Sequence, residues 1–163
     1  KVAFLPLGGS GKDWQQEGCA AYLQMVSRLR TAGEMAKQEG ITIGIRTGMG
    51  AKFDKKLLKK VGSSQIKVYY NFQDAADHHR DICKELRKLG AQRIVQIHAS
   101  NTDSVNLQED PEINLPKIRK TLDKMKWSGW LVVERSRDVK RVRDVKYNFG
   151  RNIAYLKQVF QEW

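Results

Sequence analysis

A short apolar segment followed by an amphipathic helical pattern recurs five times along the chain, and this alternation constrains the fold more than any other feature. The apolar segments cover residues 2–7, 41–46, 66–72, 93–98 and 130–134. Segments that are apolar along their whole length are typical of parallel strands that are buried on both faces. Because helical patterns separate them, the sequence predicts an α/β fold with a parallel sheet covered by helices.

The intervening segments carry apolar residues at the spacing of one helix face. We expect helices around residues 22–36, 53–61, 75–89, 115–125 and 149–163. Gly40, Gly62 and Gly90 follow the first three of these, where glycine commonly ends a helix. A polar stretch at residues 99–114 is the least regular part of the chain. Its length of 163 residues predicts one domain over residues 1–163.

Two architectures contain repeated strand–helix units of this kind. One is an open parallel sheet, and the other is a TIM barrel, which needs eight units and usually about 250 residues. Five units are too few to close that barrel, so the fold class is a parallel (βα) arrangement with five of the eight units: an incomplete barrel or an open sheet.

Four successive strands end in polar residues, namely Arg46, Asn71, His98 and Glu134. In a barrel the chemistry lies at the carboxyl ends of the strands, so these side chains are candidates for one site at a common rim. The alternative is that they mark ordinary transitions from strand to loop. For His98, a hydrogen-bonded core histidine is as good an interpretation as a functional one.

The charge balance is strongly basic, with 30 lysines and arginines against 18 acidic residues and a net charge of +12. Such an excess attracts anions, including nucleic acid. The basic residues, however, recur at helical spacing opposite the apolar stripes, which indicates solvated helix faces and makes nucleic acid an unlikely partner. No apolar segment reaches the roughly 20 residues of a membrane-spanning helix, so we expect no membrane partner.

Two cysteines, Cys19 and Cys83, fall in helical patterns and do not form a CxxC pair. They are interpreted as small core residues, and they give no indication of a disulfide framework or of a zinc ribbon. A reducing, cytoplasmic setting is the expectation that follows.

The chain resembles the carboxyl-terminal part of the xylose isomerase-like TIM barrels, a superfamily that includes sugar phosphate isomerases/epimerases and AP endonucleases. The resemblance rests on a strand that ends in His98, a long loop, a helix, and the segment Trp-Ser-Gly-Trp-Leu-Val-Val-Glu-Arg-Ser at 127–136. Tyr-Asn-Phe-Gly at 147–150 is similar to the start of the closing helix. Taken over the whole chain, the resemblance implies strands four to eight of the family barrel.

The resemblance also implies a divalent metal, Mn, Mg or Zn, held at the barrel mouth by Glu, Asp, His and Glu from strands five to eight. Glu134 and His98 match the last two ligands. Asn71 stands in place of the Asp and offers only a neutral amide oxygen. Arg46 stands in place of the first Glu, and a guanidinium has no lone pair for a metal. The expected metal site is therefore degraded.

The activity implied by the resemblance is isomerisation or epimerisation of a sugar or sugar phosphate, through proton transfer next to a carbonyl. Glu134, His98 and Arg46 are the candidate catalytic residues; Arg46 either pairs with Glu134 or holds a substrate anion, and the pairing is slightly favoured. Candidate substrate-binding residues are Asn71, Asn101, Arg135, Arg137 and Asn148. A phosphate near Arg135, Arg137 and the last helix is one possibility, and a solvated charged loop is the other.

A non-catalytic role is the alternative function. A five-stranded parallel sheet has two unpaired edge strands, which favour association with other chains. In this interpretation the chain is a natural or engineered barrel fragment that forms a homo-oligomer or assembles with a complementing chain. A nucleic-acid role related to the AP endonucleases ranks third, because the chain has only three histidines as potential ligands.

Overall fold

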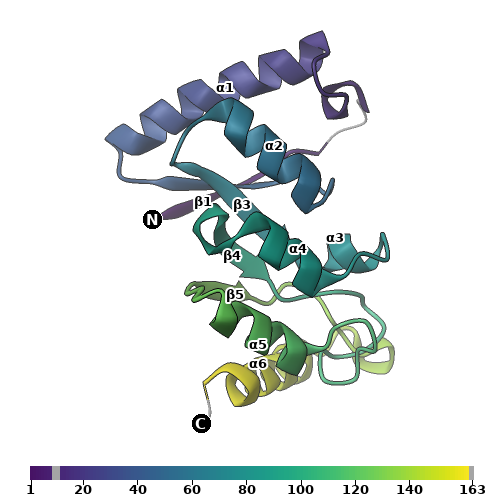
Figure 1. Cartoon of the computed structure of the whole chain (residues 1–163). Coiled ribbons are helices and arrows are strands. Elements are labelled where there is room, and N and C mark those ends of the chain that lie inside the picture. The colour runs from purple at the N-terminus through teal and green to yellow at the C-terminus, as the bar shows by residue number, and fades with distance from the viewer. Residues whose placement is uncertain (9–11, 162–163) are drawn as a thin grey trace.

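The computed structural model describes residues 1–8 and 12–161, and it contains one parallel five-stranded sheet with helices packed along it (Figure 1). The strands lie in chain order: β1 (Val2–Pro6), β2 (Thr42–Arg46), β3 (Ile66–Asn71), β4 (Ile94–His98) and β5 (Trp130–Val132). Every neighbouring pair is parallel. The sheet is an open half-barrel, so the predicted fold class is confirmed.

Six α-helices occupy the described residues: α1 (Ala20–Gln38), α2 (Ala51–Val61), α3 (Phe72–Ala76), α4 (Ile82–Leu89), α5 (Leu115–Lys124) and α6 (Val145–Phe160). Short 3-10 turns cover Lys12–Gln15, Ala91–Arg93 and Val139–Arg141. No helix in the described part of the chain is both long enough and apolar enough to cross a membrane.

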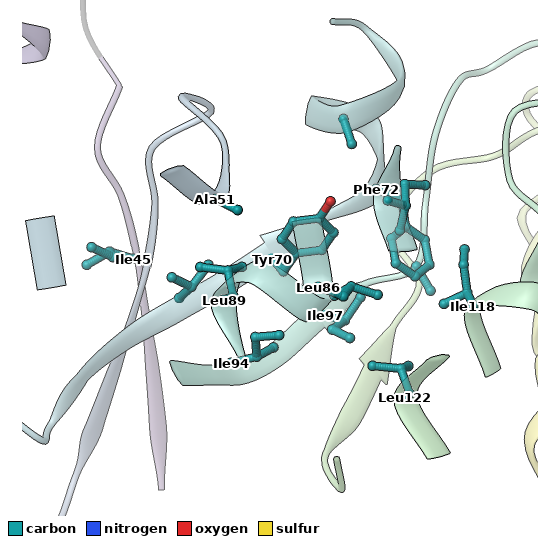
Figure 2. Close-up of a cluster of buried hydrophobic side chains, with 14 of the residues drawn as sticks. Ile45, Ala51, Tyr70, Phe72, Leu86, Leu89, Ile94, Ile97, Ile118 and Leu122 are labelled. Carbon is teal, nitrogen blue, oxygen red and sulfur yellow. The ribbon is translucent and has the colours of Figure 1, made fainter. Parts of the chain in front are cut away.

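The hydrophobic core fills the space between the sheet and the helices (Figure 2). Ile45 of β2 and Ile97 of β4 are fully buried there, and Leu86 and Leu89 of α4 pack in the same cluster. Side chains along a strand point alternately to the two faces of the sheet. On these strands, one alternating set of apolar side chains points toward the helices. The other set is left for the opposite, concave face of the half-barrel.

The concave face has an aromatic group at its centre. The rings of Phe4 (β1), Tyr69 (β3) and His98 (β4) contact one another, with centroids 4.3–5.4 Å apart. Gly44 of β2 makes room for this group, since a Cβ at this position would lie 3.0 Å from the Tyr69 ring and 2.9 Å from Val95. Because Gly44 has no side chain, the Tyr69 ring can lie across β2 at this position.

One expected helix is two helices in the structure. The apolar stripe at residues 75–89 predicts a single helix, but α3 ends at Ala76 and α4 begins at Ile82. His79 adopts a left-handed backbone with φ of 50°, and the Asp81 carboxylate accepts a hydrogen bond from the backbone N–H of Lys84. A left-handed residue and a strong N-cap end one helix and start the next.

The two cysteines differ in position. Cys83 is buried within α4, as predicted, and belongs to the core cluster. Cys19 is only partly buried and precedes α1 as its N-cap, where its Sγ accepts a hydrogen bond from the backbone N–H of Tyr22. Cys19 still packs against the core, so the interpretation of this residue is confirmed in part; it precedes the helix instead of lying within it.

Candidate active site at the carboxyl ends of the strands

Three of the four polar residues at the strand ends meet at one point. Asn71 and His98 are register partners at the ends of β3 and β4, and Glu134 lies two residues beyond β5. The His98 Nδ1 is 3.4 Å from the Asn71 Nδ2 and 3.3 Å from the Glu134 Oε2. The parallel strands thus bring an amide, an imidazole and a carboxylate to a shared rim.

His98 is the buried centre of this group. Its side chain is 8% exposed, whereas the Glu134 side chain is 55% exposed and reaches solvent. Burial lowers the pKa of His98, and the nearby Glu134 opposes this shift only in part. The imidazole is therefore neutral at pH 7. Its Nδ1 accepts from the Asn71 amide when unprotonated and donates to Glu134 when protonated, so one proton decides which contact forms.

Asn71 has a second, structural role. Its Oδ1 accepts a hydrogen bond of 2.8 Å from the backbone N–H of Gln73 and caps α3. Asparagine is a favoured N-cap residue for this reason. The cap fixes the orientation of the amide and turns its Nδ2 toward His98.

The partner of Arg46 is Asp74 of α3, not Glu134. The Arg46 Nε and Nη2 donate to the two carboxylate oxygens of Asp74, at 2.9 and 2.6 Å. This bidentate bond raises the pKa of Arg46 above its ordinary value. The favoured pairing with Glu134 is therefore wrong: α3 starts directly after β3 and places Asp74 beside the end of β2.

A buried acidic cluster that sequence analysis missed lies behind this ion pair. Asp54 of α2 is 6% exposed and accepts a short hydrogen bond from the Thr47 hydroxyl. Nearby, the Glu85 Oε2 accepts a hydrogen bond of 3.1 Å from the Tyr70 hydroxyl, and the Glu85 Oε1 lies 3.4 Å from the Arg80 Nε. Burial raises the pKa of Asp54 to about 7. Asp54 sits within a charged helix sequence, so no pattern in the sequence distinguishes it from a surface residue.

Two serine hydroxyls connect the loops that follow β4 and β5. The Ser100 Oγ accepts hydrogen bonds from the backbone N–H groups of Glu134 and Arg135, at 2.8 and 3.2 Å. In the opposite direction, the Ser136 Oγ accepts from the backbone N–H of Asn101 at 2.8 Å. The backbone at Glu134 is consequently fixed to the end of β4.

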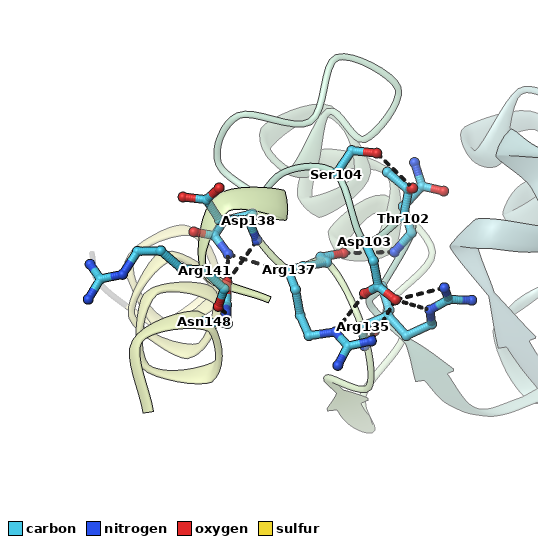
Figure 3. A network of polar contacts seen from close by, with 12 residues as sticks. Thr102, Asp103, Ser104, Arg135, Arg137, Asp138, Arg141 and Asn148 are labelled. Carbon is cyan, nitrogen blue, oxygen red and sulfur yellow. Dashed lines mark hydrogen bonds and ion pairs between the residues drawn. The ribbon is translucent and has the colours of Figure 1, made fainter. Parts of the chain in front are cut away.

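Arg135 and Arg137 both bind Asp103 (Figure 3). Each guanidinium donates twice to this carboxylate, over distances of 2.7–3.1 Å. The two arginines hold the pKa of Asp103 at about 2, below its ordinary value. The two guanidinium groups that are candidates for binding a substrate phosphate are thus already paired with a carboxylate in the loop after β4.

The other two candidate substrate-binding residues are buried. Asn101 is 2% exposed, and its Nδ2 donates to Asp110 and Glu112 within its own loop. Asn148 of α6 is fully buried, and its side chain makes four hydrogen bonds, to groups of Asn106, Asp138, Arg141 and Asp144. Figure 3 shows it beside Asp138 and Arg141. Both amides therefore hold loop segments together, and among the described residues neither bonds to His98, Asn71 or Glu134.

The donor set at the rim does not fit the metal that the resemblance implies. The described residues contain no group of three or more His, Cys, Asp or Glu side chains arranged to hold a metal ion. At the rim, His98 and Glu134 are the two metal-binding side chains in contact, the Asn71 oxygen is bound to Gln73, and Arg46 is a cation. His98 and Glu134 alone therefore do not complete the coordination of a divalent ion.

A parallel, helix-covered half-barrel with ionisable residues at the carboxyl ends of its strands defines a protein of the TIM-barrel class. The family model described as xylose isomerase-like TIM barrel matches residues 2–159, and the chain belongs to this family. No curated protein matches it significantly.

Solved structures of low sequence identity share the fold. A 3-keto-D-glucoside 4-epimerase from E. coli has a TM-score of 0.74 at 12% identity, with 95% of this chain and 63% of that chain covered. A xylose isomerase domain protein from Planctomyces limnophilus has a TM-score of 0.72 at 14% identity, with 97% and 60% covered. A D-psicose 3-epimerase has a TM-score of 0.71 at 13% identity, with 85% and 56% covered. The chain spans less than two thirds of the length of these relatives.

Proposed function

We propose that this chain forms strands four to eight of a sugar isomerase/epimerase-like barrel, with Glu134 as the residue that transfers a proton next to a carbonyl of the sugar. The observation that supports the proposal is the contact of His98 Nδ1 with Glu134 Oε2 at 3.3 Å, at the carboxyl ends of consecutive parallel strands. Structures with the same fold include a D-psicose 3-epimerase, an L-ribulose 3-epimerase and a 3-keto-D-glucoside 4-epimerase.

In the proposed step, the Glu134 carboxylate removes a proton from the carbon next to the carbonyl. The electron pair of the broken C–H bond forms a C=C bond, and negative charge develops on the former carbonyl oxygen. Donors that lie near the rim, the Asn71 amide and the Arg46 guanidinium, favour that charge. A single carboxylate serves a transfer between adjacent carbons on one face, which favours isomerisation over inversion at one carbon.

The charges at the rim favour an uncharged sugar as the substrate. Arg46 is paired with Asp74, Arg135 and Arg137 are paired with Asp103, and Glu134 adds a negative charge. A phosphate would compete with carboxylates already bound bidentately, and such pairs are among the strongest hydrogen-bonded contacts in proteins. The proposal therefore gives a neutral ketose or aldose precedence over a sugar phosphate.

Deuterium exchange tests the proposed chemistry directly. The wild-type chain, incubated in D2O with D-fructose, D-psicose or D-tagatose, is expected to introduce deuterium at the carbon next to the carbonyl. The Glu134→Gln variant should lose at least about 100-fold of this rate, in line with the usual contribution of a general base. Mass spectrometry and NMR of the recovered sugar measure the exchange.

Glu39→Gln is the matched control, because Glu39 is exposed at the end of α1 and lies outside the rim. Its exchange rate should equal that of the wild type. No exchange with a folded wild-type chain for any of the three sugars, or equal rates for Glu134→Gln and wild type, would contradict the proposal.

Assembly with a second chain is a candidate function of its own, and the open edge of the sheet favours it. A groove of about 860 Å³ runs along β5 between α5 and α6. Trp130 on this edge is 73% exposed and Ile153 of α6 is 45% exposed. An exposed strand edge bordered by apolar side chains is a site for pairing with another strand. We propose a second copy of this chain as the occupant.

Sedimentation velocity over a range of concentrations checks this assembly. We expect the wild type to self-associate in the micromolar range, and the double variant Trp130→Lys/Ile153→Lys to shift at least tenfold toward the monomer because it places charges in the groove. Met35→Lys is the control, since Met35 is 61% exposed on α1, away from the groove. A strictly monomeric wild type would rule out the homo-oligomer.

A further inference from the structure

The rim contains a fixed positive charge where the family resemblance implies a metal ligand. Arg46 is the last residue of β2. The neighbouring strand β3 ends with Asn71, and β4, which follows β3 in the sheet, ends with His98. We infer that the Arg46 guanidinium, held by Asp74, takes the place of a divalent metal as the permanent cation of this site. The inference concerns the same rim as the proposed function, but it is tested by metal binding without any sugar, so the two can fail separately.

The geometry of the Arg46–Asp74 pair makes the cation a permanent part of the site. Both carboxylate oxygens of Asp74 are engaged, by Nε and by Nη2, and the two side chains are only 29% and 18% exposed. A bidentate pair shielded from water holds the guanidinium in one orientation. The Nη1 group takes no part in this pair and bonds to no other group among residues 1–8 and 12–161, so it can donate to an oxygen atom of a ligand.

The charge of Arg46 reaches the rest of the rim. The pKa of His98 is lowered chiefly by burial; the Arg46 guanidinium lowers it further, and the carboxylates of Glu134 and Asp74 oppose the shift. A divalent ion bound to His98 and Glu134 would meet this same repulsion.

Too few oxygen and nitrogen atoms remain at the rim to serve as ligands of a metal ion. The Asn71 Oδ1 accepts from the backbone of Gln73, so recruiting it would uncap α3. His98 and Glu134 remain, while Mg²⁺ and Mn²⁺ prefer about six ligands with several oxygens and Zn²⁺ prefers four. The rim thus lacks a complete ligand set for a metal ion because of Arg46 and Asn71, and Arg46 instead forms an ion pair with Asp74.

Mn²⁺ binding, followed by the EPR signal of the free ion, tests the inference. At micromolar Mn²⁺, the wild-type chain should leave the signal of free Mn²⁺ unchanged. The triple variant Arg46→Glu/Asn71→Asp/Asp74→Asn introduces two carboxylates at the rim and removes the carboxylate left without its cation. It should bind Mn²⁺ at least about 100-fold more tightly than wild type, because affinity rises steeply with the number of charged ligands.

Two further variants make the result specific to this rim. His98→Ala, added to the triple variant, should abolish the gained Mn²⁺ binding. The double variant Arg46→Glu/Asn71→Asp provides a second version in case the triple variant does not fold, as judged by circular dichroism. Micromolar Mn²⁺ binding by the wild type that is lost in His98→Ala would overturn the inference, and so would folded variants that gain no affinity.

Discussion

Replacing Asn148 by alanine is expected to lower the free energy of unfolding by about 3–5 kcal/mol. Asn148 is fully buried, and its amide has all four hydrogen-bonding positions occupied. Its Oδ1 accepts from the Asn106 side chain and the Asp138 backbone, and its Nδ2 donates to the carbonyl groups of Arg141 and Asp144. Truncation removes the side-chain partner of all four groups. The Asp144 carbonyl still accepts from the backbone N–H of residue 148, and each of the other three loses a hydrogen bond whose absence costs about 1–3 kcal/mol when the group stays unsatisfied.

Urea unfolding of the wild type and of Asn148→Ala measures this difference. Asn114→Ala is the matched control, because Asn114 is exposed and makes one capping bond of 2.9 Å to the backbone N–H of Lys117. Its loss should cost about 1 kcal/mol. A loss for Asn148→Ala no larger than that of Asn114→Ala would show that the network around α6 carries little of the stability.

Replacing Asp54 by asparagine is expected to stabilise the protein above neutral pH by about 1–3 kcal/mol. The pKa of Asp54 rises from 3.8 in a model compound to about 7 in the folded protein, chiefly because the carboxyl group is buried. Between these two values the folded state binds more protons than the unfolded chain, so stability falls as pH rises. Asparagine carries no charge and still accepts from the Thr47 hydroxyl, so this loss disappears.

The sign of the effect makes the pH profile diagnostic. The stability gained by Asp54→Asn should be near zero around pH 4, grow between pH 4 and 7, and stay constant above that. Urea unfolding at pH 4.5, 6 and 8 measures it. Asp123→Asn serves as the control, since Asp123 lies on the surface in an i,i+4 pair with Arg119. A gain that is equal at all three pH values would show that Asp54 ionises normally.

Periodicity predicted the strands and their parallel order because an apolar strand repeated before each amphipathic helix permits few other arrangements. The same reasoning placed Asn71, His98 and Glu134 together, since parallel strands end at a common rim. Both are confirmed by the register of β3 and β4 and by the contacts of His98. These features depend on backbone geometry that repeats along the chain, and a single sequence contains that information.

The partners of individual charges were not predictable in the same way. Arg46 has acidic candidates on several elements. The choice of Asp74 follows from the start of α3 directly after β3, which places the first turn of this helix close to the rim. Asp54 lies in a lysine-rich helix, where its burial depends on how α2 packs against β3 and α4. Asn148 is similar, because its four bonds reach groups in loops whose course the sequence pattern does not reveal.

The hydrogen bonds of Ser100 and Ser136 link the loops after β4 and β5 in both directions. Because Ser100 holds the backbone of Glu134, and Ser136 holds the backbone of Asn101, the two loops are coupled and a displacement of one pulls on the other. The Ser136 carbonyl is in turn bound by Asn152 of α6 at 2.7 Å. A continuous series of hydrogen bonds therefore runs from α6 through both loops to the backbone of Glu134 at the mouth of the half-barrel.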